Sequence, residues 1–258
     1  MKRVAFWTRA HHACQRRAAQ WFGRRPFAMP PGRAIVSFTF DDFPRSALLT
    51  GGAILGRFGA SGTYYASLGI AGHHTSCGEM FMLDDLPRLV AAGHELGCHT
   101  HDHLPAWTTA PAVFEDSVRR NARALQERLP DARFASLSYP ISYPRPETKQ
   151  RVARHFACSR GGGQRFNTGT IDANFLSAFF LEQSLDEPDA IKRIMIENRA
   201  AGGWLIFATH DVAERHTRFG CTPAFFEQVV RYAADSGTDI LPVGKAWQAL
   251  TSRAAQRR

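Results

Sequence analysis

The sequence predicts an α/β protein in which helices cover a mostly parallel sheet. Segments typical of buried strands alternate along the chain with segments typical of amphipathic helices, as a parallel sheet with helical crossovers requires. The 258 residues lie within the range of single strand-and-helix barrels, and a content of 44% hydrophobic and 21% charged residues is ordinary for a globular protein. We therefore expect one domain with one sizeable core.

The first predicted strand covers residues 34–40 (AIVSFTF), which are mostly apolar or β-branched. It ends at two adjacent carboxylates, Asp41 and Asp42. Pro44 then opens a helical pattern, since proline is well tolerated in the first turn of a helix. A second short strand is expected at residues 62–66, before a loop rich in glycine and histidine.

The same succession of strands and helices continues to the end of the chain. Residues 95–98 predict a strand that delivers His99, and residues 204–209 (WLIFAT) predict a strand that ends at His210. Two shorter extended segments are expected at residues 134–139 and 239–242. Helices are predicted for residues 83–92, 112–129, 147–155, 190–201 and 223–235.

Three polar clusters follow three of these strands. They are residues 41–42, 99–103 and 210–211. Because the carboxyl ends of parallel strands meet at one side of an α/β fold, side chains far apart in the sequence can converge there. We expect the three clusters to form one site.

The residue types in these clusters indicate metal-assisted hydrolysis. One carboxylate and two imidazoles form a ligand set that Zn²⁺, Co²⁺ and Ni²⁺ all accept, and His99 and His103 are close enough in sequence to face one ion. Adjacent side chains at the end of a strand point in different directions, so one of Asp41 and Asp42 can bind the ion while the other remains free as a base. His210 is a candidate acid for the leaving amine, because an imidazole exchanges protons near neutral pH.

In order and spacing, the segments Thr39-Phe40-Asp41-Asp42, His99-Thr100-His101-Asp102-His103 and Thr209-His210-Asp211 resemble the motifs of polysaccharide deacetylases. These enzymes form carbohydrate esterase family 4, which includes the chitooligosaccharide deacetylases. The resemblance covers about residues 34–250 and implies an α/β fold, a distorted (β/α) barrel with seven or eight strands in a single domain.

The resemblance also implies a role for each matching residue. Asp41 is the catalytic base and His210 the catalytic acid, while Asp42, His99 and His103 hold a divalent metal, with Zn²⁺ the first choice and Co²⁺ or Ni²⁺ the alternatives. The implied reaction is the removal of N-acetyl groups from N-acetylhexosamine units of an oligo- or polysaccharide.

One motif departs from the family pattern. Residues 137–142 (LSYPIS) lack the arginine that the family places ahead of Pro-Pro-Tyr to hold the catalytic aspartate, which leaves Arg145 and Arg165 as candidate replacements. A backbone N–H near Ile141 is a candidate oxyanion donor. The remaining candidates for contacting or supporting the substrate are Tyr139, His101 and Asp172.

Two other classes of function compete with deacetylation of a glycan. The same fold can act on another bond, as a deformylase, an O-deacetylase or a hydrolase of a small amide. The protein can also be a non-catalytic carbohydrate-binding relative, which the missing arginine favours and the presence of all five chemical residues opposes.

The net charge of +9 comes from the two ends of the chain. Residues 1–33 contain eight basic and no acidic residues, and residues 252–258 add three arginines, so residues 34–251 form the predicted catalytic domain and carry little net charge. A nucleic-acid groove across the domain is therefore not indicated. We expect residues 1–33 to be a frayed, solvated extension, with weak binding as a basic amphipathic helix to an anionic membrane surface as the alternative.

The five cysteines are odd in number, widely spaced and without a CxxC pair, which argues against a disulfide framework and against a thiolate zinc site. The N-terminus lacks the apolar run of a secretory signal, and no apolar stretch is long enough to span a membrane. These features predict a cytoplasmic protein, with a peripheral position at the inner membrane surface as the alternative.

Overall fold

The computed structural model describes residues 13–256, except residues 142 and 186. Its main sheet has eight strands, of which seven follow one another in the order β10, β11, β2, β3, β6, β7, β8, and β12 pairs with β2 off this path. All the pairings within this sheet are parallel. The strands are β2 (Ile35–Phe40), β3 (Thr63–Ala66), β6 (Glu95–Cys98), β7 (Leu137–Ser138), β8 (Ser159–Arg160), β10 (Phe179–Phe180), β11 (Trp204–Thr209) and β12 (Asp239–Ile240).

Strand β2 is the centre of the sheet. It pairs along its whole length with β11, while β12 pairs with its first two residues and β3 with its last two. All six β2 residues are buried, which explains why this strand reads as a continuous apolar run instead of an alternating one.

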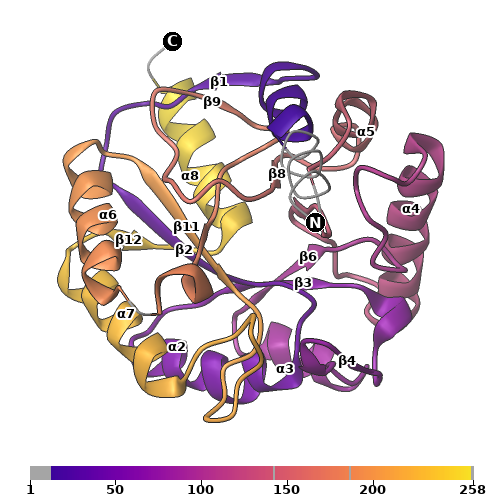
Figure 1. Cartoon of the computed structure of the whole chain (residues 1–258), viewed down its shortest axis with the longest axis horizontal. Coiled ribbons are helices and arrows are strands. Elements are labelled where there is room, and N and C mark those ends of the chain that lie inside the picture. Colours follow the sequence, from indigo (N-terminus) through magenta and orange to yellow (C-terminus); the bar gives the residue numbers. More distant parts are fainter. Residues whose placement is uncertain (1–12, 142, 186, 257–258) are drawn as a thin grey trace, which may run out of the picture.

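The sheet curls until its two ends approach each other. Arg160 of β8 forms a parallel bridge with Leu176, which lies just before β10, and the Gly161 amide donates to the Leu176 carbonyl at 2.9 Å. The segment entering β10 therefore lies beside β8, at the opposite end of the strand order. Figure 1 shows the result, a ring of helices around a curled inner sheet. The expected distorted (β/α) barrel with seven or eight strands, in a single domain, is confirmed.

Helices cover the outside of the barrel (Figure 1). The helical pattern that begins after Pro44 is observed as a π-helical segment, η1 (Ala47–Gly52), that continues into α2 (Ala53–Arg57). The other helices are α3 (Asp85–Ala91), α4 (Pro111–Arg128), α5 (Pro146–Val152), α6 (Pro188–Ala200), α7 (Pro223–Asp235) and α8 (Val243–Ala255), with short 3-10 turns η2 (Leu68–Ile70) and η3 (Leu181–Ser184).

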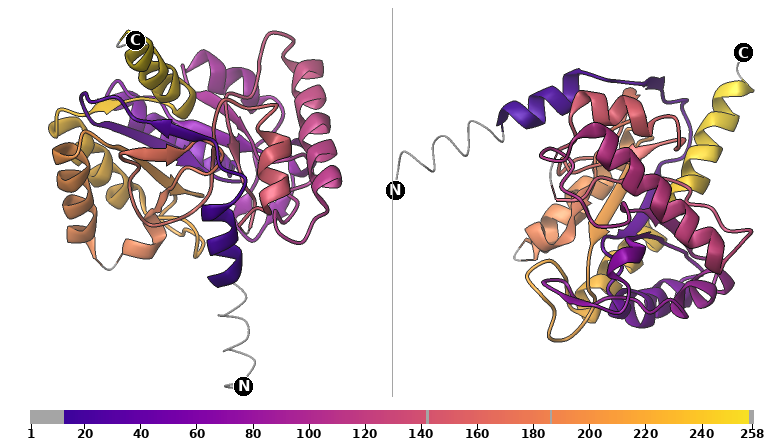
Figure 2. Two further views of the ribbon diagram at one scale, coloured as in Figure 1. Left: turned by 90° about the horizontal axis from the view of Figure 1, so that it is seen from above. Right: turned by 90° about the vertical axis from the view of Figure 1, so that its right-hand side faces the viewer.

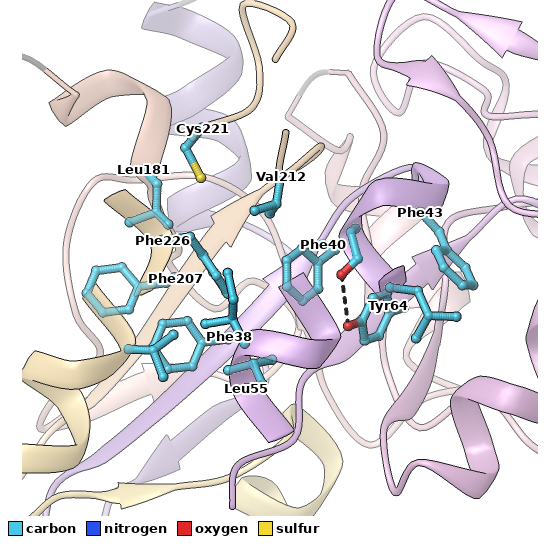
Figure 3. Packing of buried hydrophobic residues seen from close by; sticks show 14 of the residues in the cluster. Phe38, Phe40, Phe43, Leu55, Tyr64, Leu181, Phe207, Val212, Cys221 and Phe226 are labelled. Atoms are coloured by element: carbon cyan, nitrogen blue, oxygen red, sulfur yellow. Dashed lines mark hydrogen bonds between the residues drawn. The ribbon is translucent and has the colours of Figure 1, made fainter. Parts of the chain in front are cut away.

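An aromatic cluster fixes the central strand against its neighbours (Figure 3). The rings of Phe38 and Phe207 stack with centroids 5.6 Å apart, and those of Phe40 and Tyr64 stack at 4.6 Å. The buried Tyr64 hydroxyl donates to the Ala47 carbonyl at 3.2 Å, so its polar atom is satisfied. This packing determines where β2 ends, and with it the position of Asp41 and Asp42.

Most predicted elements are present, and the missed ones are short or irregular. The helix at residues 223–235 matches α7 at both ends, and the strand at residues 204–209 matches β11. The extended segment expected at residues 134–139 is reduced to β7, because only Leu137 and Ser138 pair in the sheet. The elements that we did not expect are β1 (Pro26–Ala28), β4 (His74–Thr75), β5 (Gly78–Glu79), β8, β9 (Thr170–Asp172), β10 and α8.

The N-terminal segment packs against the barrel, so the expectation of a frayed extension is wrong for residues 13–33. Residues 13–21 are helical, and β1 pairs with β9 in an antiparallel sheet. Figure 2 shows this helix projecting from one side of the barrel. The predicted boundary at residue 34 stays a prediction, and residues 1–12 and 257–258 of the two basic ends lie outside the described residues.

A buried lysine anchors this segment. Lys149 is fully buried; its Nζ donates to the carbonyls of Ala19 and Phe22, the latter at 2.9 Å, and pairs with Asp172 at 2.6 Å. The Arg25 amide also donates to Asp172 at 2.9 Å. One ion pair thus ties α5 and β9 to the N-terminal segment.

Two further observations bear on the environment of the protein. No helix among the described residues is long and apolar enough to cross a membrane, and all five cysteines are free thiols. In the N-terminal segment, Trp21 and Phe22 are 69% and 63% exposed. Weak membrane contact through the basic N-terminus and a cytoplasmic location stay predictions.

Replacing Lys149 with methionine is expected to loosen the N-terminal segment. The change leaves the buried Asp172 carboxylate without its counter-charge and two carbonyls without the ammonium donor, which typically costs about 3 to 5 kcal/mol. Urea unfolding measures the loss, and limited proteolysis should show earlier cleavage between residues 13 and 25. The control is Lys192→Met, which removes an exposed pair with Asp189 and a contact with the Tyr232 ring and should cost less than about 1 kcal/mol. Equal stabilities of the two variants would contradict the anchoring role.

Candidate metal centre

The three polar clusters converge at the carboxyl ends of their strands, as expected from a parallel sheet. Asp41 and Asp42 follow β2, His99 to His103 follow β6, and His210 follows β11. A cavity of about 920 Å³ is lined by Asp41, Asp42, His99, His103 and His210 together. The fold therefore brings all five residues singled out in the sequence to one place.

Asp42, His99 and His103 point their ligand atoms at one another. The Asp42 Oδ1 atom lies 3.2 Å from His99 Nε2 and 2.9 Å from His103 Nε2. The three residues form a group with ligand atoms within 4.8 Å of one another. Asp42 and His99 are buried, while the His103 side chain is 24% exposed toward the cavity. One carboxylate and two imidazoles thus surround a common point.

The hydrogen bonding of His99 shows why a cation suits this point. His99 Nδ1 lies 2.8 Å from the Ser138 carbonyl, which can only accept, so Nδ1 carries the proton. In the neutral ring the Nε2 lone pair then faces the Asp42 carboxylate, and the buried Oδ1 has no hydrogen-bond donor among the described residues. Two facing lone pairs repel unless a positive charge lies between them. The residues therefore fit a divalent metal.

The pKa values of Asp42 and His99 are shifted because the two side chains face each other. Burial would raise the pKa of Asp42, but its contacts with His103 and His99 hold that pKa well below the usual range. Burial would lower the pKa of His99, but Asp42 and Asp41 raise it above the usual value. Both shifts reflect the same attraction, in which the carboxylates favour a positive charge on the imidazole and the imidazoles favour a negative charge on Asp42.

Backbone strain is concentrated around the same cavity. The described non-glycine residues with positive φ are Asp42, Phe43, Thr100, His103, Ile141 and Gln164. Four of them, Asp42, His103, Ile141 and Gln164, line the cavity, and the other two are adjacent in sequence to Asp42 and His99. Such conformations cost on the order of 1 kcal/mol or more each, and they cluster where a fold holds side chains in functional positions. This distribution supports the assignment of the cavity as the functional site.

Asp41 forms a buried ion pair with Arg160 of β8. The guanidinium Nη2 contacts Asp41 Oδ1, and both side chains are less than a tenth exposed. The guanidinium also lies over the Tyr65 ring, 4.6 Å from its centroid. Burial would raise the pKa of Asp41, but Arg160, together with His99 and His210, holds it below the usual value. Asp41 is thus kept ionised.

Arg160 is a residue of this site that the sequence did not point to. The expectation that Arg145 or Arg165 orients Asp41 is wrong: Arg145 donates to the Trp107 carbonyl, and Arg165 donates to Ser177 Oγ at 3.0 Å. Arg160 belongs to β8, which is only two residues long and therefore has no alternation of apolar and polar residues that would predict a strand. The one available signal was an arginine followed by three glycines, Gly161 to Gly163, all of which line the cavity.

His210 lines the same cavity as the proposed metal ligands and is held by its own loop. Its Nδ1 donates to the Phe219 carbonyl at 3.2 Å, which leaves Nε2 free to carry or release a proton. Asp211, next in sequence, accepts from the Thr217 amide at 2.7 Å and from its hydroxyl at 2.6 Å. This loop fixes the imidazole without occupying its second nitrogen.

The other substrate-side candidates have different surroundings. Tyr139 and the 70% exposed Ile141 line the cavity. His101 is not among the lining residues and pairs at 2.9 Å with Asp102, which accepts from Ser117 on α4. Asp172 lies beneath the N-terminal segment, paired with Lys149. Roles for these four residues in oxyanion or substrate contacts stay predictions.

The comparison with protein families agrees with this geometry. Residues 28–156, half of the chain, match the family model described as polysaccharide deacetylase. The chain therefore belongs to the polysaccharide deacetylase family. No curated protein matches the sequence.

Solved structures of carbohydrate esterase family 4 share the fold. The family 4 domain of a multidomain xylanase from the hindgut metagenome of Trinervitermes trinervoides is 14% identical with a TM-score of 0.60, covering 84% of this chain and 91% of that chain. A family 4 acetyl xylan esterase from Clostridium thermocellum in complex with a cobalt ion is 16% identical with a TM-score of 0.59, covering 83% and 91%. A family 4 pseudoenzyme from Bacillus anthracis is 12% identical with a TM-score of 0.56, covering 84% and 66%.

Replacing Arg160 with methionine is expected to move the acid limb of the pH profile of kcat/KM for acyl release. Without the guanidinium the pKa of Asp41 rises, so the limb should shift toward higher pH. Arg160→Lys keeps a positive charge and should restore part of the shift. Arg165→Met, which lines the same cavity without touching Asp41, should leave the limb in place. An unshifted limb in Arg160→Met would show that Asp41 is not the titrating base.

Proposed function

We propose that the protein is a divalent-metal-dependent deacetylase that removes N-acetyl groups from N-acetylhexosamine units of an oligo- or polysaccharide. The observation that carries the proposal is the triad of Asp42, His99 and His103, whose atoms meet beside Asp41 in one cavity. The ligand set favours Zn²⁺, with Co²⁺ and Ni²⁺ as alternatives. When bound, the ion supplies Lewis acidity to the attacking water and to the acyl carbonyl.

Asp41 is the proposed base. It lies next to the ligand Asp42 in the sequence, and its ion pair with Arg160 keeps it ionised and in a fixed orientation. A base that takes a proton from water must be charged and correctly placed before the substrate arrives. The buried guanidinium provides both conditions.

His210 is the proposed acid. An amine is a poor leaving group unless its nitrogen receives a proton, and the free Nε2 of His210 can deliver one from its side of the cavity. The backbone N–H near Ile141 is the proposed donor to the developing oxyanion. Its strained backbone, with a φ of 63°, is consistent with an amide held in a required direction.

The rivals differ in which product they release. A deformylase releases formate, an O-deacetylase releases acetate from an ester, and a hydrolase of small amides needs no sugar. A non-catalytic relative releases nothing, and one structure with the same fold is named a pseudoenzyme. The paired Asp41 and the complete triad favour catalysis over that alternative.

The rim of the cavity favours an acidic glycan. Arg16, Arg165 and Arg218 line the cavity and are exposed, and none of them forms an ion pair with another described side chain. Arg16 belongs to the N-terminal helix, and Arg218 lies 4.5 Å from the centroid of the Phe219 ring. Unpaired guanidinium groups around a sugar-sized cavity suit a phosphate or carboxylate on the substrate.

Substitution of the base and of a ligand is expected to separate metal binding from chemistry. Asp41→Asn should keep the bound ion and lose acetate release from N-acetylated chitooligosaccharides, because only the proton acceptor is removed. His99→Ala should lose both the ion and the activity. Metal analysis by mass spectrometry and an acetate assay, run beside formate and ester assays, measure the two properties. A wild-type protein that binds no divalent ion under any condition would refute the proposal.

A second expected outcome concerns the rim. The double variant Arg165→Gln/Arg218→Gln should raise KM for an oligosaccharide that carries phosphate or carboxylate by about 10- to 100-fold, the usual worth of charge-assisted hydrogen bonds. KM for a neutral oligosaccharide should change little. Arg215→Gln, an exposed arginine of the same loop that does not line the cavity, is the matched control. Equal increases for the charged and neutral substrates would rule out recognition of an anionic group.

A further inference from the structure

A cysteine at the tip of a small hairpin reaches the metal centre. Strands β4 and β5 pair in register, His74 with Glu79 and Thr75 with Gly78, so Ser76 and Cys77 form the turn. Gly78 has a φ of 95°, a conformation that a residue with a side chain rarely adopts. Cys77 is 4% exposed and lines the cavity with Asp42 and His210. The turn thus directs a thiol toward the site.

The hairpin is fixed to the loop that carries Asp42. The Phe81 amide donates to the Phe43 carbonyl at 3.0 Å, and Pro44 and Met80 form an antiparallel bridge. The rings of Phe43 and Phe81 stack with centroids 4.6 Å apart and are fully buried. Cys77 is therefore held at a set position relative to Asp42, as a ligand must be.

Asp42, Cys77 and His210 form a second group of potential metal ligands. Their ligand atoms lie within 4.8 Å of one another, the same limit that describes the Asp42, His99 and His103 group. Asp42 belongs to both groups, and a carboxylate can bind one ion through each oxygen. The Asp42 Oδ1 atom faces His99 and His103 and is buried without a hydrogen-bond donor among the described residues, so it belongs to the first group.

We propose that Asp42, Cys77 and His210 form a second metal position, which takes a thiophilic divalent ion such as Zn²⁺ and shares Asp42 with the first. This inference rests on the proposed function, because the first position is the one formed by Asp42, His99 and His103. The two positions differ in their donor atoms. The first offers two nitrogens and an oxygen, whereas the second replaces one nitrogen with sulfur, a softer donor that favours Zn²⁺.

Occupation of the second position has a consequence for the proposed reaction. A metal bound through His210 occupies the imidazole that protonates the leaving amine, and binding to Cys77 releases the thiol proton to solvent. One ion in the first position then activates the enzyme, and a second ion inhibits it. The activity would therefore rise as Zn²⁺ fills the first position and fall as Zn²⁺ fills the second.

Cobalt titration of the full-length apoprotein tests the proposal, because a thiolate bound to Co²⁺ gives a sulfur-to-metal charge-transfer band in the near ultraviolet. The expected result is a first equivalent without this band and a second equivalent with it. Cys77→Ser should keep the first equivalent, lose the band and bind the second ion at least about 10-fold more weakly. Cys77→Ala serves as a second variant, and a thermal melt establishes that each variant is folded.

Cys14→Ser is the matched control, since Cys14 is exposed and does not line the cavity. It should behave as the wild-type protein does. Excess Zn²⁺ should suppress acyl release in the wild type and in Cys14→Ser, relative to the activity of each with one equivalent, and suppress it less in Cys77→Ser.

Three results would overturn the second position: binding of a single equivalent, a sulfur band within the first equivalent, or a band that persists in Cys77→Ser. The proposed function fails differently. If both ions bind as described and no acyl group is released from any substrate, the second position stands and the assigned reaction does not.

Discussion

The buried ion pair between Arg160 and Asp41 is the interaction on which the rest of the site depends. Asp41 follows the central strand β2, and Arg160 belongs to β8 at the end of the strand order, with β3, β6 and β7 between them. Side chains at those two places can meet only because the sheet curls into a barrel. Closure of the barrel therefore brings Arg160 to Asp41 and keeps the proposed base ionised. A flat sheet of the same strands would leave Asp41 without its counter-charge.

Charge balance explains the arrangement of the whole centre. Asp41 and Asp42 are adjacent, buried and both have lowered pKa values, so two negative charges face one cavity. Arg160 neutralises the first, and the point between Asp42 and the two imidazoles calls for a cation that neutralises the second. Removing one partner of a buried pair is costly because the other remains charged in a medium of low polarity. Asp41 thus has Arg160 as its positive partner, and Asp42 has the proposed metal. This difference assigns Asp41 as the proposed base and Asp42 as the proposed ligand.

The sequence predicted the strands that carry the site, but it did not predict the ion pairs that support the site and the N-terminal segment. The runs 34–40 and 204–209 are buried on both faces, so their apolar character was visible, and Asp41, Asp42, His99, His103 and His210 could be placed at strand ends. Arg160 was not predicted because β8 is two residues long and its partners lie far away in the sequence. The N-terminal segment was misjudged for a related reason. Its anchor, the pair between Lys149 and Asp172, joins residues in two distant elements, and neither has a local pattern that reveals it.

The position of that N-terminal helix has a further consequence for how such a protein diversifies. Arg16 and Gln20 line the cavity from a segment that precedes the first strand of the barrel, whereas the metal ligands and Asp41 belong to the barrel itself. Part of the cavity lining therefore belongs to a segment that is separate from the residues of the proposed reaction. Substitutions at Arg16 or Gln20 would change the lining of the cavity while Asp41 and the proposed metal ligands keep their positions, so the entrance of the site can vary independently of the groups inside it.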